Sequence, residues 1–350
     1  MHRRSHSHAM TLPVLAVVAT VWSLAVAPSL ASPQQRYAYR RGEMGTYLRI
    51  VLYAADRATA DRVAEKAFAR AHELVAVLSS YDPQSELSRL VAASRHAAPT
   101  RPIRVSEPLW EVLDRSVALS RATDGAFDVT VGPYVRLWKR ARQLRELPSA
   151  RRLAEAGRSA GFHKLRLDAQ QRTVTLLAPR MRIDLGAVAK GYIVDQVLSG
   201  IREEGLHRAL VDAGGDLAVG AAPPGQLGWR IGLVTADEEA TGPVEFVWLC
   251  DRAVATSGDT YRHVEIDGQR YSHLIDPRTG LGMTRRLLVT ICAPDCMTAD
   301  SLASAVSLLG IEKGLALIEG RPHLAARLID LDAQPPRTVT SEGFPPTHRP

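Results

Sequence analysis

The sequence has few cysteines, and their arrangement excludes two common kinds of site. Only Cys250, Cys292 and Cys296 occur among the 350 residues. An odd count does not describe a disulfide framework, although Cys292 and Cys296 could pair in an oxidising compartment. Their C-x3-C spacing is a poor zinc motif, and no histidine cluster accompanies it. We expect all three cysteines to be structural.

Three widespread ligand-binding signatures are also missing. There is no G-x-x-x-x-G-K-[ST] phosphate loop, no G-x-G-x-x-G dinucleotide turn and no H-E-x-x-H zinc motif. Each of these places a phosphate or a metal ion on a defined loop or helix. Any nucleotide or metal must therefore be held by other segments of this chain.

Charge and hydrophobicity describe a folded protein without a nucleic-acid partner. The net charge of +7 is a diffuse excess, which suits anionic small molecules, a membrane surface or simply a solvated, arginine-rich surface. Hydrophobic residues make up 46% and charged residues 23%, so a sizeable core is available and disorder is not indicated.

The N-terminus has the pattern of a secretory signal peptide. Arg3 and Arg4 precede an uncharged apolar run over residues 12–27, and small residues follow at 29–31. We expect a signal peptide over residues 1–31 and export to the periplasm. An uncleaved anchor is the alternative, and no cysteine follows the run to carry a lipid. No later segment is long and apolar enough to cross a bilayer.

Hydrophobic periodicity predicts an α+β fold with mixed or antiparallel sheets and flanking helices, in one domain over residues 44–331. A flexible lead-in over 32–43 and a disordered tail over 332–350 flank it. Expected strands cover 44–53, 164–168, 172–177 and 323–329. Expected helices cover 57–79, 107–121, 149–160, 297–309 and 311–319, and residues 182–203 read as a strand, a glycine turn and a helix.

Two helix starts carry oxygen and cationic groups. In residues 183–192, a strand ends at Asp184, Gly186 permits a tight turn, and Lys190 falls in the first turn of a helix. Helix amides and a lysine form a natural diphosphate site, and a plain strand–helix turn is the alternative. Asp300 and Ser304 share a helix face and are hard ligands suited to Mg²⁺, whereas a simple helix cap would also explain an aspartate there.

Further polar segments lie between strands. His273 is placed on a strand before an Asp-Pro turn, where it would act as a general base or be an ordinary core histidine. Phe127 would face an aromatic ring and Asp128 would bind a base or ribose, unless this loop is merely well packed. Residues 212–216 form a glycine turn that serves the fold more than a ligand.

Taken in order, these segments resemble the ApbE family of FAD:protein FMN transferases. The resemblance spans roughly residues 44–310. The matching segments are MGT (44–46), SSYDPQSELSRL (79–90), GAFDVTVGP (125–133), IDLGAVAKGY (183–192), DAGGDL (212–217), ATSGD (255–259), HLIDPRTG (273–280) and MTADSLASA (297–305).

The resemblance implies the ligands and their residues. Mg²⁺, or Mn²⁺, would bridge the diphosphate of FAD, held by the carbonyl of Ala187 with Asp300 and Ser304. FAD would contact Met44, Tyr81, Ala126, Phe127, Asp128, Asp184, Lys190 and His273. His273, Lys190 and Asp300 would carry catalysis. This chain has Val129 where proline is common, Ala187 where a second glycine is common, and Ser304 where threonine is frequent.

The implied reaction is transfer of FMN from FAD to a threonine or serine hydroxyl of a partner, with release of AMP. The expected acceptor is a membrane-bound redox subunit facing the same compartment. Two alternatives use the same residues: hydrolysis of FAD to FMN and AMP, and FAD binding or trafficking without catalysis.

Overall fold

The computed structural model describes residues 34–95, 97–235, 245–258 and 263–349. The expected signal peptide and Asp259 of the ATSGD segment lie outside the described residues. In the part of the chain that the structure covers, no helix combines the length and the apolar character needed to traverse a bilayer.

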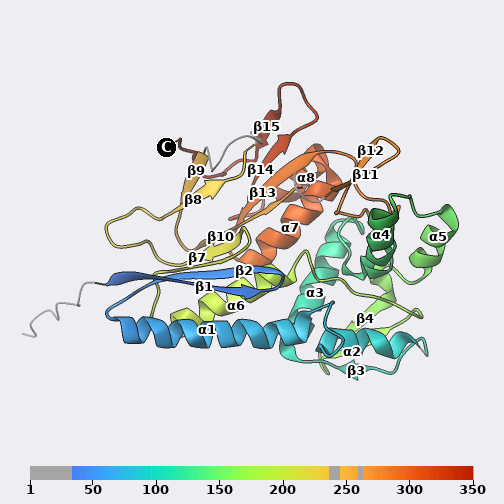
Figure 1. The fold of residues 1–350 in the computed structure, drawn as a ribbon, viewed down its shortest axis with the longest axis horizontal. Helices are drawn as coiled ribbons and strands as arrows, with labels where there is room; N and C mark the ends of the chain where they lie inside the picture. The colour runs from blue at the N-terminus through green and yellow to red at the C-terminus, as the bar shows by residue number, and fades with distance from the viewer. Residues whose placement is uncertain (1–33, 96, 236–244, 259–262, 350) are drawn as a thin grey trace, which may run out of the picture. The chain divides into compact units, whose positions relative to one another are not determined.

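A large antiparallel sheet forms the centre of the fold (Figure 1). Every strand pair among the described residues is antiparallel, as are the smaller sheets. In sheet order, its strands are β1 (Gln35–Glu43), β2 (Thr46–Ala54), β6 (Ala209–Ala213), β7 (Asp216–Val219), β10 (Arg252–Ser257), β13 (Leu287–Ala293), β14 (Ala325–Asp330) and β15 (Arg337–Thr340).

Three small sheets and the helices surround it. The small sheets pair β3 (Ile103–Arg104), β5 (Thr173–Leu176) and β4 (Leu165–Asp168); β8 (Trp229–Leu233) and β9 (Glu245–Leu249); and β11 (His263–Ile266) and β12 (Gln269–Ser272). The helices are α1 (Arg57–Leu78), α2 (Glu86–Ala92), α3 (Glu107–Ala122), α4 (Gly132–Leu144), α5 (Ala150–Arg158), α6 (Ala189–Glu203), α7 (Cys296–Leu309) and α8 (Ile311–Ile318). The α+β prediction is confirmed.

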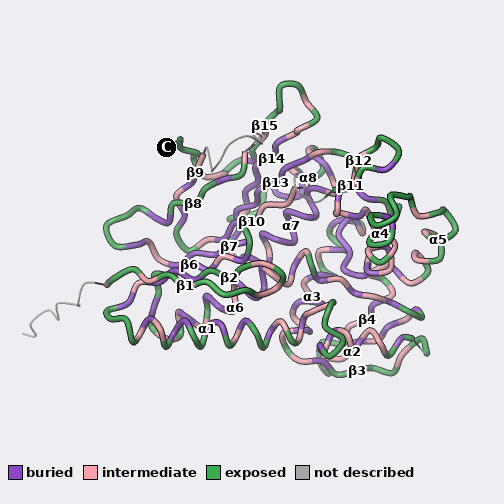
Figure 2. Tube along the Cα trace, viewed as in Figure 1, coloured by how far each residue is buried: buried purple, intermediate pink, exposed green. Residues whose placement is uncertain are grey.

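The sheet has a different cover on each face. Leu48, Ile50 and Leu52 of β2 point to one face and join the core formed with α1, α6 and α7. Val51, between them, points to the other face and packs with the β8–β9 hairpin. This follows from the two-residue period of a strand. Figure 2 shows buried residues along the sheet, α6 and α7, whereas α1 alternates between buried and exposed positions.

The helices α6 and α7 cross at their N-termini and cap each other. Asp195 of α6 accepts hydrogen bonds from the backbone N–H groups of Cys296 and Met297, at 2.7 and 2.8 Å. Asp300 of α7 accepts one from the backbone N–H of Gly191, at 3.2 Å. Burial raises the pKa of Asp195 to about 7, although the two N–H groups oppose this. The two helix starts that the sequence singled out therefore lie side by side.

Both ends of the described chain are ordered, which corrects two expectations. The segment expected as a flexible lead-in forms β1, which pairs with β2 along its whole length. The segment expected as a disordered tail contains β15 and pairs again where Phe246 and His348 form a β-bridge. Alternation was overlooked in both because charged and polar residues fill the solvent-facing positions.

One local expectation also needs correction, and the possible pairing of Cys292 with Cys296 is not found. Residues 182–185 form no strand, because the Asp184 N–H bonds to the Val129 carbonyl and not to a neighbouring strand. All three cysteines are free. Cys292 belongs to the core under β8–β9 and Cys296 to the core under the helices, so the two do not pair.

We predict that Gly191→Ala destabilises the protein. A Cβ at Gly191 would overlap the backbone of Cys296 and lie 2.7 Å from the Cα of Met297, neither of which can rotate away. Overpacking of this kind costs roughly 1–3 kcal/mol. The measurement is urea unfolding followed by circular dichroism.

The matched control is Gly200→Ala in the same helix. A Cβ at Gly200 meets nothing within 4 Å. Alanine there should be neutral or stabilise by about 0.5–1 kcal/mol, because it lowers the entropy of the unfolded chain. Equal unfolding free energies for the two variants would contradict a close crossing.

Candidate functional site

Lys190 lies in the first turn of α6 and is held by a buried carboxylate. Its Nζ pairs with Asp216, the first residue of β7, whose exposed fraction is only 4%. Val188 at the N-cap provides no side-chain acceptor for the helix amides. A cation and the positive end of a helix dipole thus share one place, which is the arrangement that binds phosphate groups.

Asp300 and Ser304 lie one turn apart on α7, both buried. Burial raises the pKa of Asp300, and the Lys190 charge and the Gly191 N–H act in the opposite direction. Ser301 and Ser307 donate to helix carbonyls one turn back, whereas no such bond of Ser304 Oγ is found among the described residues. A buried carboxylate beside an uncommitted hydroxyl fits a hard cation.

No group of three or more histidine, cysteine, aspartate or glutamate side chains gathers in the described parts of the chain in a way that could hold a metal ion. A cation bound here would therefore use one carboxylate together with neutral oxygens. The partly buried turn at Ala187, directly before α6, offers backbone carbonyls for that purpose. The residues present fit the magnesium site that the resemblance implies.

Two glycine-containing turns meet next to Lys190. Met44 and Gly45 join β1 to β2 with φ of 54° and 70°, the left-handed conformation that a two-residue hairpin turn requires. Thr46 abuts Gly214, where a Cβ would lie 2.7 Å from the threonine Oγ1. Gly214 opens the turn that leads into Asp216. The MGT and DAGGD segments therefore come together, and the second positions Lys190.

Hydrogen bonds to a buried carboxylate hold the GAFDVTVGP loop (residues 125–133) in place. Asp128 is buried and accepts hydrogen bonds from the N–H and Oγ1 of Thr130 and from the N–H of Phe162. The Phe127 ring packs in the core, with 3% exposed, and Ala126 is fully buried. A ligand would reach these residues through their backbone. Val129 accepts the N–H of Asp184 at 2.7 Å, which joins this loop to the start of α6.

Tyr81 and the turn that follows His273 both contact α4. Tyr81 is 72% exposed, and Lys139 of α4 lies 4.4 Å from its ring centre. His273 directly follows β12 instead of lying on it. The turn after it docks on α4, because Trp138 Nε1 donates to the carbonyl of Gly280 at 2.8 Å.

The predicted site residues therefore fall into two groups according to their contacts. The first joins the Met44 turn, Lys190, Asp300 and Ser304 at the α6–α7 crossing. The second gathers Tyr81, Ala126, Phe127, Asp128 and His273 around α4 and the loop before it. Asp184 links them, because it bonds to the loop and begins the turn that leads into α6.

Two functional candidates were missed by the sequence reasoning. Asp216 was visible as the acidic residue after a Gly-Gly turn, but its pairing with Lys190 depends on the sheet. Asp195 carries no sequence signal, since its role comes from the helix crossing. A formal G-x-S-x-G match at 157–161 is not a nucleophile elbow, because Ser159 is the C-cap residue after α5 and its Oγ donates to the carbonyl of Pro179.

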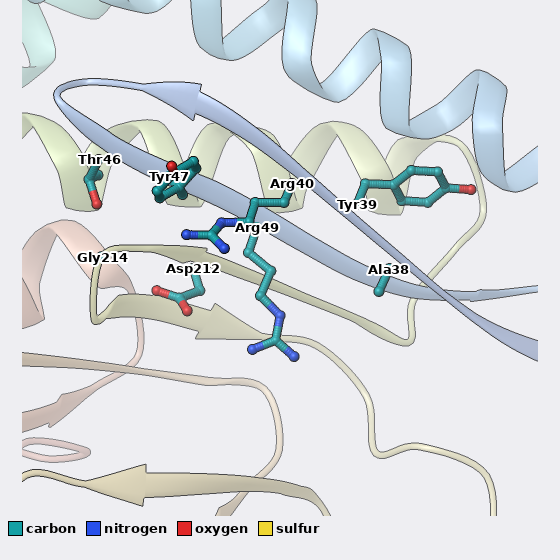
Figure 3. A pocket seen from close by; sticks show the side chains of 8 residues that line it. All are labelled: Ala38, Tyr39, Arg40, Thr46, Tyr47, Arg49, Asp212 and Gly214. Carbon is teal, nitrogen blue, oxygen red and sulfur yellow. The ribbon is translucent and has the colours of Figure 1, made fainter. Parts of the chain in front are cut away.

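Two cavities flank this region without being lined by Lys190, Asp300 or His273. One of about 280 Å³ lies between α3 and the start of α7, and Arg115 at its rim bonds to Asp295 and Thr298. The other, of about 520 Å³, lies beside the β1–β2 turn (Figure 3). Lys190 and Asp300 at the α6–α7 crossing thus line neither cavity.

Comparison with known proteins shows consistent relatives. The FAD:protein FMN transferase of Vibrio cholerae serotype O1 is 34% identical over 258 residues, covering 73% of this chain and 75% of that protein. That of Haemophilus influenzae is 33% identical over 280 residues, covering 78% and 79%. The solved flavin transferase ApbE from Vibrio cholerae has a TM-score of 0.77 at 29% identity, covering 89% of this chain and 99% of that one.

A second solved structure agrees. The apo form of Pseudomonas stutzeri flavinyl transferase ApbE has a TM-score of 0.77 at 29% identity, covering 89% of this chain and 96% of that one. Residues 44–328 match the ApbE family as a whole, and this range contains every site residue discussed above. The chain belongs to the ApbE family.

Proposed function

We propose that this chain transfers the FMN half of FAD onto a threonine or serine hydroxyl of another protein, with Mg²⁺ or Mn²⁺, and releases AMP. The observation that carries the proposal is the α6–α7 crossing, where Lys190 pairs with Asp216 and the N–H of the next residue, Gly191, bonds to Asp300. A diphosphate needs both a cation and a metal-binding carboxylate at one place. The names of the relatives support the same reaction.

Residues of the chain bind and orient the FAD. Lys190 holds the diphosphate as a point charge, and Asp216 keeps its ammonium group in place. The Met44 turn, Asp184 and the backbone of residues 126–128 line the path of the dinucleotide. Tyr81, which is exposed, closes over the bound flavin. The interaction with Lys190 strengthens as negative charge develops on the phosphate during transfer.

The metal ion would be held by Asp300, Ser304 and the carbonyl of Ala187. A bound metal ion would supply positive charge that neutralises the diphosphate. Ser304 suits this role because Ser301 and Ser307 of α7 bond to helix carbonyls, whereas no such bond of Ser304 is found within the described ranges. Asp300 remains tied to the Gly191 N–H, so the carboxylate is already oriented.

The transfer exchanges the phosphoanhydride bond of the FAD diphosphate for a phosphoester bond to the acceptor. The acceptor hydroxyl oxygen bonds to the phosphorus of the FMN half. The bond from that phosphorus to the bridging oxygen breaks, and AMP leaves with that oxygen. His273 accepts the hydroxyl proton as general base. We further propose that the reaction takes place in the periplasm after export and that the acceptor is a membrane-bound redox subunit.

The first prediction concerns the reaction itself. Purified protein incubated with FAD, Mg²⁺ and synthetic peptides that each contain one threonine should yield peptide carrying covalent FMN, together with AMP. Mass spectrometry and flavin fluorescence report the product. Peptides with valine in place of threonine, and samples with EDTA, should remain unlabelled.

Two outcomes would contradict transfer and identify another activity. AMP and free FMN without labelled peptide would indicate a hydrolase. Tight FAD binding without turnover would indicate a binding or trafficking protein.

A second prediction tests the metal ligands. Ser304→Ala should raise the Mg²⁺ concentration needed for half-maximal activity by about tenfold or more, because one oxygen ligand is lost. Asp300→Asn, which retains an oxygen for the Gly191 N–H, should abolish metal-dependent turnover. Ser307→Ala is the matched control, since Ser307 is bonded to Ala303 in the same helix. An equal effect of the two serine variants would remove Ser304 from the site.

A third prediction concerns the diphosphate. Lys190→Ala should weaken FAD binding by about tenfold or more, because a charge-assisted contact with phosphate is lost. Lys313→Ala, an exposed lysine of α8, should leave the affinity unchanged. Fluorescence titration of FAD measures both. Unchanged affinity in Lys190→Ala would show that this lysine does not bind the diphosphate.

A further inference from the structure

The larger cavity lies on the sheet face that points away from α1, beside the β1–β2 turn. Its volume is about 520 Å³. In Figure 3, the side chains of Arg40, Arg49 and Asp212 project to one side of the β1–β2 hairpin. The Tyr39 hydroxyl instead bonds to Asp61 of α1, at 2.7 Å. The lining residues are Ala38, Tyr39, Arg40, Thr46, Tyr47, Arg49, Asp212 and Gly214.

The two arginines of this cavity form an unusual pair. Arg40 and Arg49 are directly opposite each other on β1 and β2, so their side chains share one face. Like charges at such positions are destabilising. Arg40 lies over the ring of Tyr47 at 3.4 Å, and Tyr47 is 54% exposed. The pair therefore does not stabilise the folded protein, and binding of an anionic ligand would explain its presence.

Neither guanidinium has a carboxylate partner among the described residues. Asp212 is directly opposite Arg49 on β6, and its Oδ1 accepts the N–H of Gly215, at 2.9 Å. The lining therefore carries two cations and one anion, an excess of one positive charge. Guanidinium groups on directly opposite residues of two strands can bind a carboxylate through paired N–H donors.

The position of the cavity connects it with the transfer site. Thr46 directly follows the Met44–Gly45 turn, and Gly214 lies in the turn that leads into Asp216, the partner of Lys190. The cavity therefore opens at the same two turns that border the proposed diphosphate site. A peptide lying in it would pass over these two turns to reach the proposed diphosphate site on the other face of the sheet.

We propose that this cavity docks an acidic side chain of the acceptor protein, in the segment next to its threonine or serine. The proposal rests on the proposed transfer function. Arg40 and Arg49 bind the carboxylate, and the Tyr47 ring packs against the neighbouring peptide. Charge complementarity here selects the acceptor, whereas the FAD is held from the α6–α7 side.

The test uses fluorescent peptide pairs and the full chain. Each pair contains one central threonine, with aspartates at set distances from it in one peptide and asparagines in the other. Binding is followed by fluorescence anisotropy, and FMN transfer by mass spectrometry. The variants are Arg40→Gln, Arg49→Gln and, as matched control, Arg36→Gln. Arg36 is exposed and lies on the same strand and face, outside the cavity.

The expected result is that the wild type binds an aspartate peptide at least about tenfold more tightly than its asparagine twin. Arg40→Gln and Arg49→Gln should each reduce that preference by about fivefold to tenfold, with unchanged FAD affinity and unchanged AMP release without acceptor. Arg36→Gln should retain it. No preference for aspartate, or equal loss in all three variants, would overturn the proposal.

Two further results separate this proposal from the proposed function and from other anions. Aspartate-dependent binding without FMN transfer by the wild type would refute the transfer function and leave the docking surface without a role in catalysis. Binding to anionic phosphatidylglycerol vesicles that is lost in the arginine variants, with no peptide preference, would assign the cavity to membrane lipid and overturn acceptor docking.

Discussion

The exchange of carboxylate caps between α6 and α7 is the constraint on which the site depends. Asp195 accepts the N–H groups at the start of α7, and Asp300 accepts an N–H near the start of α6. Gly191 allows this because any side chain there would overlap the Cys296 backbone. Since helix starts carry partial positive charge, a crossing of two starts is also the natural place for a phosphate. The contact that joins the two helices is thus also the place proposed for the diphosphate.

The remaining parts of the site are placed by loops that pack on one another. The hairpin turns at Met44 and Gly214 meet, and the second positions Asp216 against Lys190. The buried Asp128 fixes the loop that receives the Asp184 N–H. These links explain how short segments spread over much of the chain come together in the candidate site.

Sequence reasoning was most reliable where a local signal existed. The helices after Asp56, Ser106 and Ser149 carry caps, and their starts agree within a residue or two of the expected ones. Strands β1 and β15 were overlooked because charged residues mask their alternation. Asp195 and the pairing of Arg40 with Arg49 could not be foreseen, because they depend on which helix and strand become neighbours.

The tight packing at Gly191 has a consequence for how this scaffold can change. Because the Cys296 backbone fills the space beside Gly191, α6 cannot shift without displacing α7 and the sheet behind it. The proposed diphosphate site therefore rests on a rigid contact, whereas the exposed positions of β1 are less constrained in composition. Under the proposed function, divergence towards new client proteins would then proceed through those exposed positions, with the helix junction inherited unchanged.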